Sequence, residues 1–168
     1  MDVEKLLTHM GWSNREIFGE VSKLPDFALD SYVDNPTWTA REIISHICES
    51  ATWYAWCLRK EGDGFDWQDH IARSKIRPTT SVDIQALIHV QEVTDSKLMM
   101  AKSEPDEQLT IDLAGNPFTC ARSTIVTQAI HHATEHRTQL VAALVAANFT
   151  EINLDNYHLW GFKEIQAK

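Results

Sequence analysis

The chain has 168 residues and carries 24 acidic against 15 basic side chains, which gives a formal net charge of −9. This charge argues against binding to nucleic acid or to an anionic membrane, because both need a cationic surface. Hydrophobic residues make up 43% of the chain and charged residues 23%, as in ordinary globular proteins. We therefore expect residues 1–168 to fold as a single domain.

Composition also bears on cellular location. No apolar run reaches the roughly 20 residues that a membrane span needs. The first five residues lack the basic-then-apolar pattern of a secretory signal. The three cysteines form no Cys-x-x-Cys pair and no even set, so they predict free thiols in a reducing compartment. Together these features predict a cytoplasmic protein.

Apolar periodicity predicts two helices in the first half of the chain. Apolar residues recur at three- and four-residue steps over residues 3–24, and Pro25 ends this helix. A second helix is expected from Thr39 to about residue 60, because Thr39 and Glu42 match a capping box. Residues 65–80 are rich in polar side chains and are expected to form a long connection.

The second half contains two more predicted helices. One covers residues 82–103 behind a cap at Ser81 or Thr80, and the other covers residues 119–147 behind a cap at Thr119. Between them, residues 109–118 alternate apolar and polar around a turn, which predicts a short extended hairpin. The tail, 148–168, has enough apolar side chains to pack on the helices. Four long helices predict an all-α four-helix bundle, and its long connections allow crossovers.

Two histidines of the last predicted helix have a spacing that suits a metal ion. His132 and His136 are four residues apart, so they lie on one helical face about one turn apart. The same face carries Ile125 and Leu140, so both imidazoles are expected to point inward. The segment lacks the His-Glu-x-x-His motif of zinc proteases, which rules out that class.

A third ligand has to come from another helix, and His46 is the candidate because it lies on the inward side of the second helix. Three neutral imidazoles suit Zn, Ni or Fe(II) and leave a position open for water or substrate. Glu49 and Glu135 are candidates for a fourth ligand, a general base or a side chain that supports a ligand; solvated helix faces are the alternative. A set of hydrogen-bonded core histidines without a metal is the alternative for the whole site.

Other residues with chemical potential are expected to have structural roles. Cys48 and Cys57 are expected to be buried thiols, because reactive cysteines need an electropositive setting. Five further histidines are expected at the surface, at helix caps or at a pocket edge: His9, His70, His89, His131 and His158.

The segment 132–139, His-Ala-Thr-Glu-His-Arg-Thr-Gln, resembles the His-x-x-x-His-Arg-x-Gln signature of the DinB/YfiT-like metalloenzyme superfamily. Similarity at the level of pattern extends over nearly the whole chain. The resemblance implies a four-helix bundle with one divalent metal ion held by His46, His132 and His136. Glu135 and Thr138 stand where many members have His and Gly, and this departure leaves the substrate class open.

Characterised relatives in this superfamily include transferases and isomerases that use low-molecular-weight thiols such as bacillithiol or mycothiol. The resemblance therefore implies a metal-dependent thiol transferase that acts on a small molecule, and Arg137 or another cation near the pocket mouth is a candidate to hold a carboxylate of the thiol. Two alternatives stay open: a metal-dependent hydrolase with Glu49 or Glu135 as base, and a non-catalytic, stress-associated protein that the metal pins together. The family also implies a homodimer.

Overall fold

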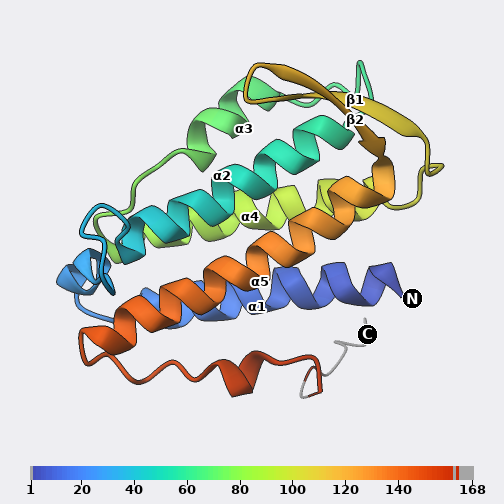
Figure 1. Ribbon diagram of the computed structural model, residues 1–168. Coiled ribbons are helices and arrows are strands. Elements are labelled where there is room, and N and C mark those ends of the chain that lie inside the picture. The colour runs from blue at the N-terminus through green and yellow to red at the C-terminus, as the bar shows by residue number, and fades with distance from the viewer. Residues whose placement is uncertain (1, 161, 163–168) are drawn as a thin grey trace.

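The computed structural model describes residues 2–160 and 162, and within them the chain is mostly helical. Four long helices run the length of the molecule: α1 (Val3–Val21), α2 (Ala40–Leu58), α4 (Ser81–Ala101) and α5 (Arg122–Ala146) (Figure 1). The shorter elements are α3 (Trp67–Ser74), the strands β1 (Gln108–Leu113) and β2 (Asn116–Ala121), and two 3-10 turns, η1 (Asp26–Asp30) and η2 (Leu154–Tyr157).

Each long helix packs against two others. Helices α1 and α2 both contact α4 and α5, so the four enclose a shared apolar interior. In Figure 1, α5 (orange) crosses the front of the molecule with α2 on one side and α1 on the other. The interior consists of two clusters, one around Phe18 and Leu140 and one around Met10 and Ile125. The inward apolar stripes that the sequence predicts are therefore the residues that hold the helices together.

The predicted hairpin is present, but the start of the last helix differs from the prediction. Strands β1 and β2 pair antiparallel, with Leu113 opposite Asn116 at the turn. Strand β2 runs directly into α5, whose N-cap is Ala121. Thr119 is therefore a strand residue, and its hydroxyl lies 2.9 Å from that of Thr110 on β1.

The predicted connection over residues 65–80 contains a helix, α3. Asp66 caps it by accepting a hydrogen bond from the Asp69 backbone N–H at 3.0 Å. Trp67, His70 and Ser74 lie buried on its inner face. A helix of only two turns buries too few side chains to show a clear apolar period, which is why the polar composition concealed it.

The capping box lies at a different helix from the one predicted. Thr39 precedes α2, but its hydroxyl is buried without a hydrogen-bond partner and caps nothing. Thr80 and Asp83 instead form a complete capping box at the start of α4. Thr80 is one of the two cap residues that the sequence predicts for that helix.

The described part of the C-terminal tail packs on the helices, as predicted. Ile152 and Phe162 are buried, and Nε2 of His9 on α1 lies 2.8 Å from the carbonyl oxygen of Tyr157. The rest of the predicted tail, 161 and 163–168, lies outside the described residues. None of the described helices is long and apolar enough to span a membrane.

Candidate metal centre

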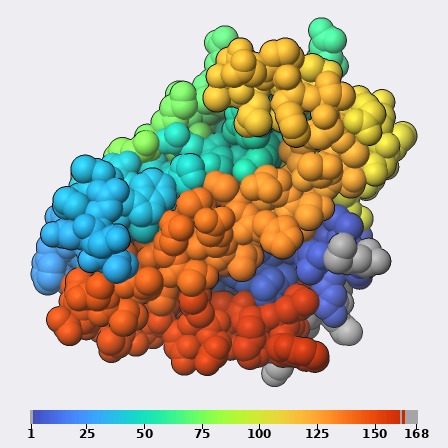
Figure 2. All heavy atoms as spheres, viewed as in Figure 1, coloured from blue at the N-terminus to red at the C-terminus, as the bar shows by residue number. Residues whose placement is uncertain are grey.

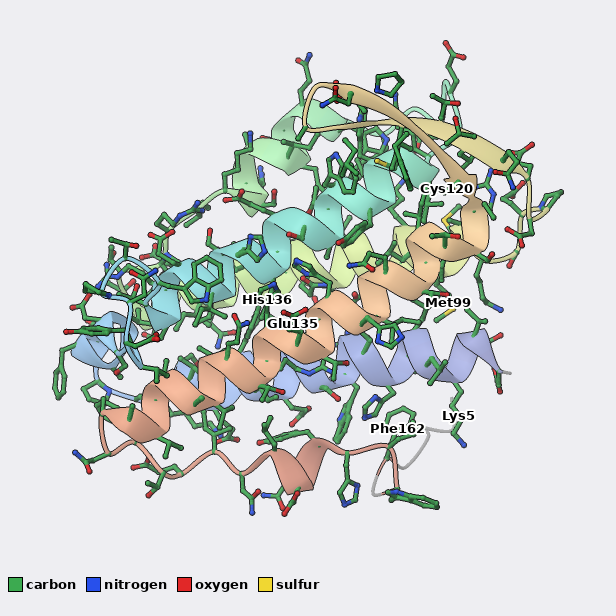
Figure 3. All side chains as sticks on the ribbon, viewed as in Figure 1. Lys5, Met99, Cys120, Glu135, His136 and Phe162 are labelled. Atoms are coloured by element: carbon green, nitrogen blue, oxygen red, sulfur yellow. The ribbon has the colours of Figure 1, made fainter. Side chains whose placement is uncertain are left out.

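Three histidines from two helices meet beside the core. His46 lies on α2, and His132 and His136 lie one turn apart on α5. One nitrogen from each ring lies within 4.8 Å of the other two, and no other Cys, His, Asp or Glu among the described residues joins this group. His136 is buried and lies between α5 and α2 (Figure 3), whereas His46 and His132 are partly exposed. The group is therefore anchored in the core and accessible on one side.

The spacing of the three rings fits a small cation. Nε2 of His46 and Nε2 of His132 are 3.0 Å apart. Two nitrogens bound to one tetrahedral zinc ion lie about 3.3 Å apart, because each Zn–N bond is about 2.0–2.1 Å long. The ring centroids of the three pairs are 4.2, 4.5 and 4.8 Å apart. The residues present therefore fit one divalent ion with a coordination position left open.

The electrostatics also favour metal binding. Burial, together with charge on the neighbouring imidazoles, lowers the pKa of His46 and lowers the pKa of His132 to about 4. Both rings are therefore uncharged at neutral pH. The neutral imidazole is the form that coordinates a metal, so protons compete little for these two nitrogens.

Gln139 orients the third ring. Its Oε1 accepts the indole N–H of Trp38 at 3.0 Å and lies 2.9 Å from Nδ1 of His136. An indole N–H can only donate, so the oxygen of the Gln139 amide, and not its nitrogen, occupies this place. His136 therefore carries its proton on Nδ1, which leaves the lone pair of Nε2 free for a metal.

A pocket of about 330 Å³ opens beside His46. Its walls include Trp53 and Tyr54 of α2 and Ile71 of α3, with Lys75 directly after α3. In Figure 2 the surface of α2 (teal) is set back between α3 (green), the hairpin (gold) and α5 (orange). Small-molecule sites commonly have volumes of about 300–1,000 Å³. A small molecule in this pocket would therefore touch one of the three histidines.

The match to a known family covers nearly the whole length of this helical chain. The model of the DinB family matches residues 1–162. The chain belongs to the DinB family. This result confirms the family that the segment His132 to Gln139 indicated. No curated protein and no solved structure matches the chain significantly.

In this DinB-family chain Glu49 forms an ion pair with an arginine. Arg77, in the loop after α3, contacts Glu49 and Ser45 through Nη1, and its Nε pairs with Glu42 at 2.7 Å. Arg77 thus joins two carboxylates that lie one turn to either side of His46. Glu49 is consequently an ion-paired neighbour of the histidines. Arg77 could not be recognised from the sequence, because its partners lie on α2, far away along the chain.

Glu135 is exposed on α5 next to His136, and Figure 3 labels both residues. Its charge raises the pKa of His46, as the charge of Glu49 does. Neither acid belongs to the group of ligand atoms. Both therefore influence the site through their charge.

Arg137 lies in the interior of the protein. Its side chain is 5% exposed, and it donates to Asn14 Oδ1 at 2.7 Å and to Thr134 Oγ1 at 3.0 Å. Burial lowers its pKa to about 10. The hypothesis that Arg137 binds a carboxylate at the pocket mouth is wrong. One residue after His136, the side chain points about 100° away around the helix and ties α5 to α1.

His70 is also more buried than expected. Its Nε2 lies 2.8 Å from Thr94 Oγ1 on α4, which in turn lies 3.2 Å from Thr52 Oγ1 on α2. Burial lowers the pKa of His70. His70 therefore links α3 to α4 and, through Thr94, to α2. The sequence does not predict this role because it does not predict α3.

Cys48 is buried, as predicted, whereas Cys57 is only partly buried. Burial raises the pKa of Cys48, and it raises the pKa of Cys57 to about 11. Both therefore remain protonated at neutral pH, and a protonated thiol is a poor nucleophile. Among the described residues, Cys48, Cys57 and Cys120 are all free thiols.

Proposed function

We propose that this protein is a metal-dependent enzyme of the thiol-transferase type on a DinB four-helix bundle, with one divalent ion held by His46, His132 and His136. The observation that carries the proposal is a set of three imidazoles beside an open pocket. Catalytic zinc sites typically use three protein ligands and an open position, whereas structural zinc sites use four. The set of histidines is therefore of the catalytic kind.

In this proposal some residues of the site bind the ion and others contact the substrate. Zn, Ni or Fe(II) suits three imidazoles, and such an ion lowers the pKa of a thiol that it coordinates. Gln139 fixes the proton of His136, so that its Nε2 is ready to bind. Trp53 and Tyr54 offer aromatic surface to the body of a substrate in the pocket.

Hydrolysis is the second candidate, and Glu135 is the residue that favours it. Its carboxylate makes no ion pair with any residue in the described part of the chain, whereas Glu49 is held by Arg77. A free carboxylate that is close enough to the site to raise the pKa of His46 can accept a proton from water. Substitution of Glu135 by Gln would then abolish hydrolysis and leave thiol transfer intact.

The experiment compares reactions on one set of preparations. Metal-free protein is reconstituted with Zn, Ni or Fe(II), and transfer of N-acetylcysteine to an electrophilic dye is measured beside hydrolysis of p-nitrophenyl acetate. Metal-dependent thiol transfer that is lost in His132→Ala supports the first proposal. A rate that is the same without metal contradicts both reactions. A fully loaded protein that is inactive in both assays favours a structural metal.

A further inference from the structure

We infer that the pocket beside His46 selects ligands that carry a carboxylate, and that the ammonium group of Lys75 binds this carboxylate. The inference rests on the proposed function, because it places the anionic end of a ligand whose other end reaches the histidines. It assigns to Lys75 the task for which Arg137 is wrongly placed.

The charges around the pocket leave one lysine uncompensated. Glu49 and Lys75 are the charged side chains that line the pocket. The charge of Glu49 is met by Arg77, which also pairs with Glu42. Lys75 is exposed, and it makes no ion pair with any residue that the structure describes. The pocket therefore has a positive group at its rim and an ion-paired carboxylate within it, whose partner Arg77 is shared with Glu42.

The exposed positive charge of Lys75 contrasts with the negative net charge of the protein. A chain with a net charge of −9 repels anions over most of its surface. An anion is attracted where a cation stands apart from acidic neighbours. Lys75 is the cationic side chain that lines the pocket, and it is exposed.

The wall between Lys75 and the histidines is largely apolar. The rings of Trp53 and Tyr54 meet edge to face with centroids 5.2 Å apart, and Ile71 faces the same pocket. Tyr54 also contacts His132, with ring centroids 5.7 Å apart. An aromatic surface therefore extends from the pocket to the candidate metal site. The complementary ligand has an apolar middle, a reactive group at one end and a carboxylate at the other.

The test compares two ligands that differ in charge but hardly in shape. Binding of 4-phenylbutyrate and of its neutral amide to zinc-loaded protein is measured by titration calorimetry at low salt. An ion pair at an exposed lysine strengthens binding by about threefold to fivefold, and we expect the carboxylate to bind tighter than the amide by this factor. Added salt should reduce the preference, because it screens exposed charges.

Two substitutions at position 75 and one control substitution test whether Lys75 causes the preference for the carboxylate. Lys75→Gln should abolish the preference, and Lys75→Glu should reverse it in favour of the amide. Lys23→Gln is the matched control, because it removes one exposed positive charge from the end of α1, away from the pocket. Circular dichroism checks that the variants fold; Lys75 makes few contacts, so we expect no change.

Each result decides between distinct conclusions. If the carboxylate and the amide bind equally, or if neither binds, the inference is overturned. A preference that persists in Lys75→Gln also overturns it, because the carboxylate then binds elsewhere, for example at the metal. Thiol transfer is assayed on the same preparations. A carboxylate preference without thiol transfer supports the pocket assignment and rejects the proposed reaction. Thiol transfer without a carboxylate preference supports the proposed reaction and rejects the pocket assignment.

Discussion

The indole N–H of Trp38 donates to Gln139 at 3.0 Å, although the two residues are 101 positions apart in the sequence. The same Gln139 oxygen lies 2.9 Å from Nδ1 of His136. A residue in the loop before α2 thereby sets the proton position on a candidate ligand of α5. The Trp38 ring also lies against His46, with centroids 5.2 Å apart, so it supports ligands on both helices.

Removing the Trp38 N–H should weaken metal binding. In Trp38→Phe an aromatic ring remains, but the Gln139 amide can rotate, and His136 loses its fixed tautomer. We expect the affinity for Zn to fall by about tenfold, the lower end of the effect of losing such a supporting partner. Competition with a chromogenic chelator measures the affinity. Trp53→Phe is the control, and equal affinities for both variants and the wild type would refute the orienting role.

The ion pairs of Arg77 should shift the titration of His46. Arg77 lowers the pKa of His46 and Glu49 raises it. Arg77→Gln should therefore raise the pKa of His46, and Glu49→Gln should lower it. NMR titration of the metal-free protein measures both changes. Arg73→Gln, which breaks an exposed pair with Asp69, should leave this pKa unchanged, and a shift of the same size there would contradict the assignment.

A partly buried carboxylate on α4 should make stability depend on pH. Asp95 accepts hydrogen bonds from Gln91 at 2.9 Å and from Arg15 at 3.1 Å, and burial raises its pKa from 3.8 to about 6. The folded protein thus retains a proton between pH 3.8 and about 6 that the unfolded chain releases. The stabilisation linked to this proton is complete below pH 3.8 and is lost as the pH rises through 6.

Comparison with Asp95→Asn isolates this contribution, because an amide does not titrate. As the pH rises from 4 to 7, the Tm of the wild type should fall relative to that of the variant. Thermal unfolding of metal-free protein across this range gives the difference. A difference that stays constant or changes in the opposite direction would show that the Asp95 pKa is not raised.

The buried guanidinium of Arg137 should stabilise the fold. Arg137→Met would leave Oδ1 of Asn14 buried without its donor. We expect the free energy of unfolding to fall by about 1–3 kcal/mol, the usual cost of an unsatisfied buried polar group. Urea unfolding measures the loss. Arg73→Met, at an exposed site, should change stability by less than about 0.5 kcal/mol, and equal losses in both variants would contradict the structural role.

Local patterns were enough to predict the long helices and the histidine pair. The positions of His132 and His136 on one face follow from helical geometry alone, and the inward side of α2 pointed to His46. The surroundings of the three histidines depend on tertiary contacts. The bond from Trp38 to Gln139 joins two distant segments, and Arg77 reaches α2 from a loop whose position depends on α3. Helix α3 is too short to be predicted from apolar periodicity, so the pocket that it lines could not be predicted either.

The metal content of the tag-free protein, measured by mass spectrometry, tests the role of the three histidines most directly. His132→Ala removes one ligand, and His131→Ala removes an exposed imidazole at the adjacent position, which makes it a matched control. We predict about one metal ion per chain in the wild type and in His131→Ala, and loss of the ion in His132→Ala. Absence of metal from all three proteins after reconstitution with Zn, Ni and Fe(II), or its retention in His132→Ala, would contradict the metal site and make these histidines core residues.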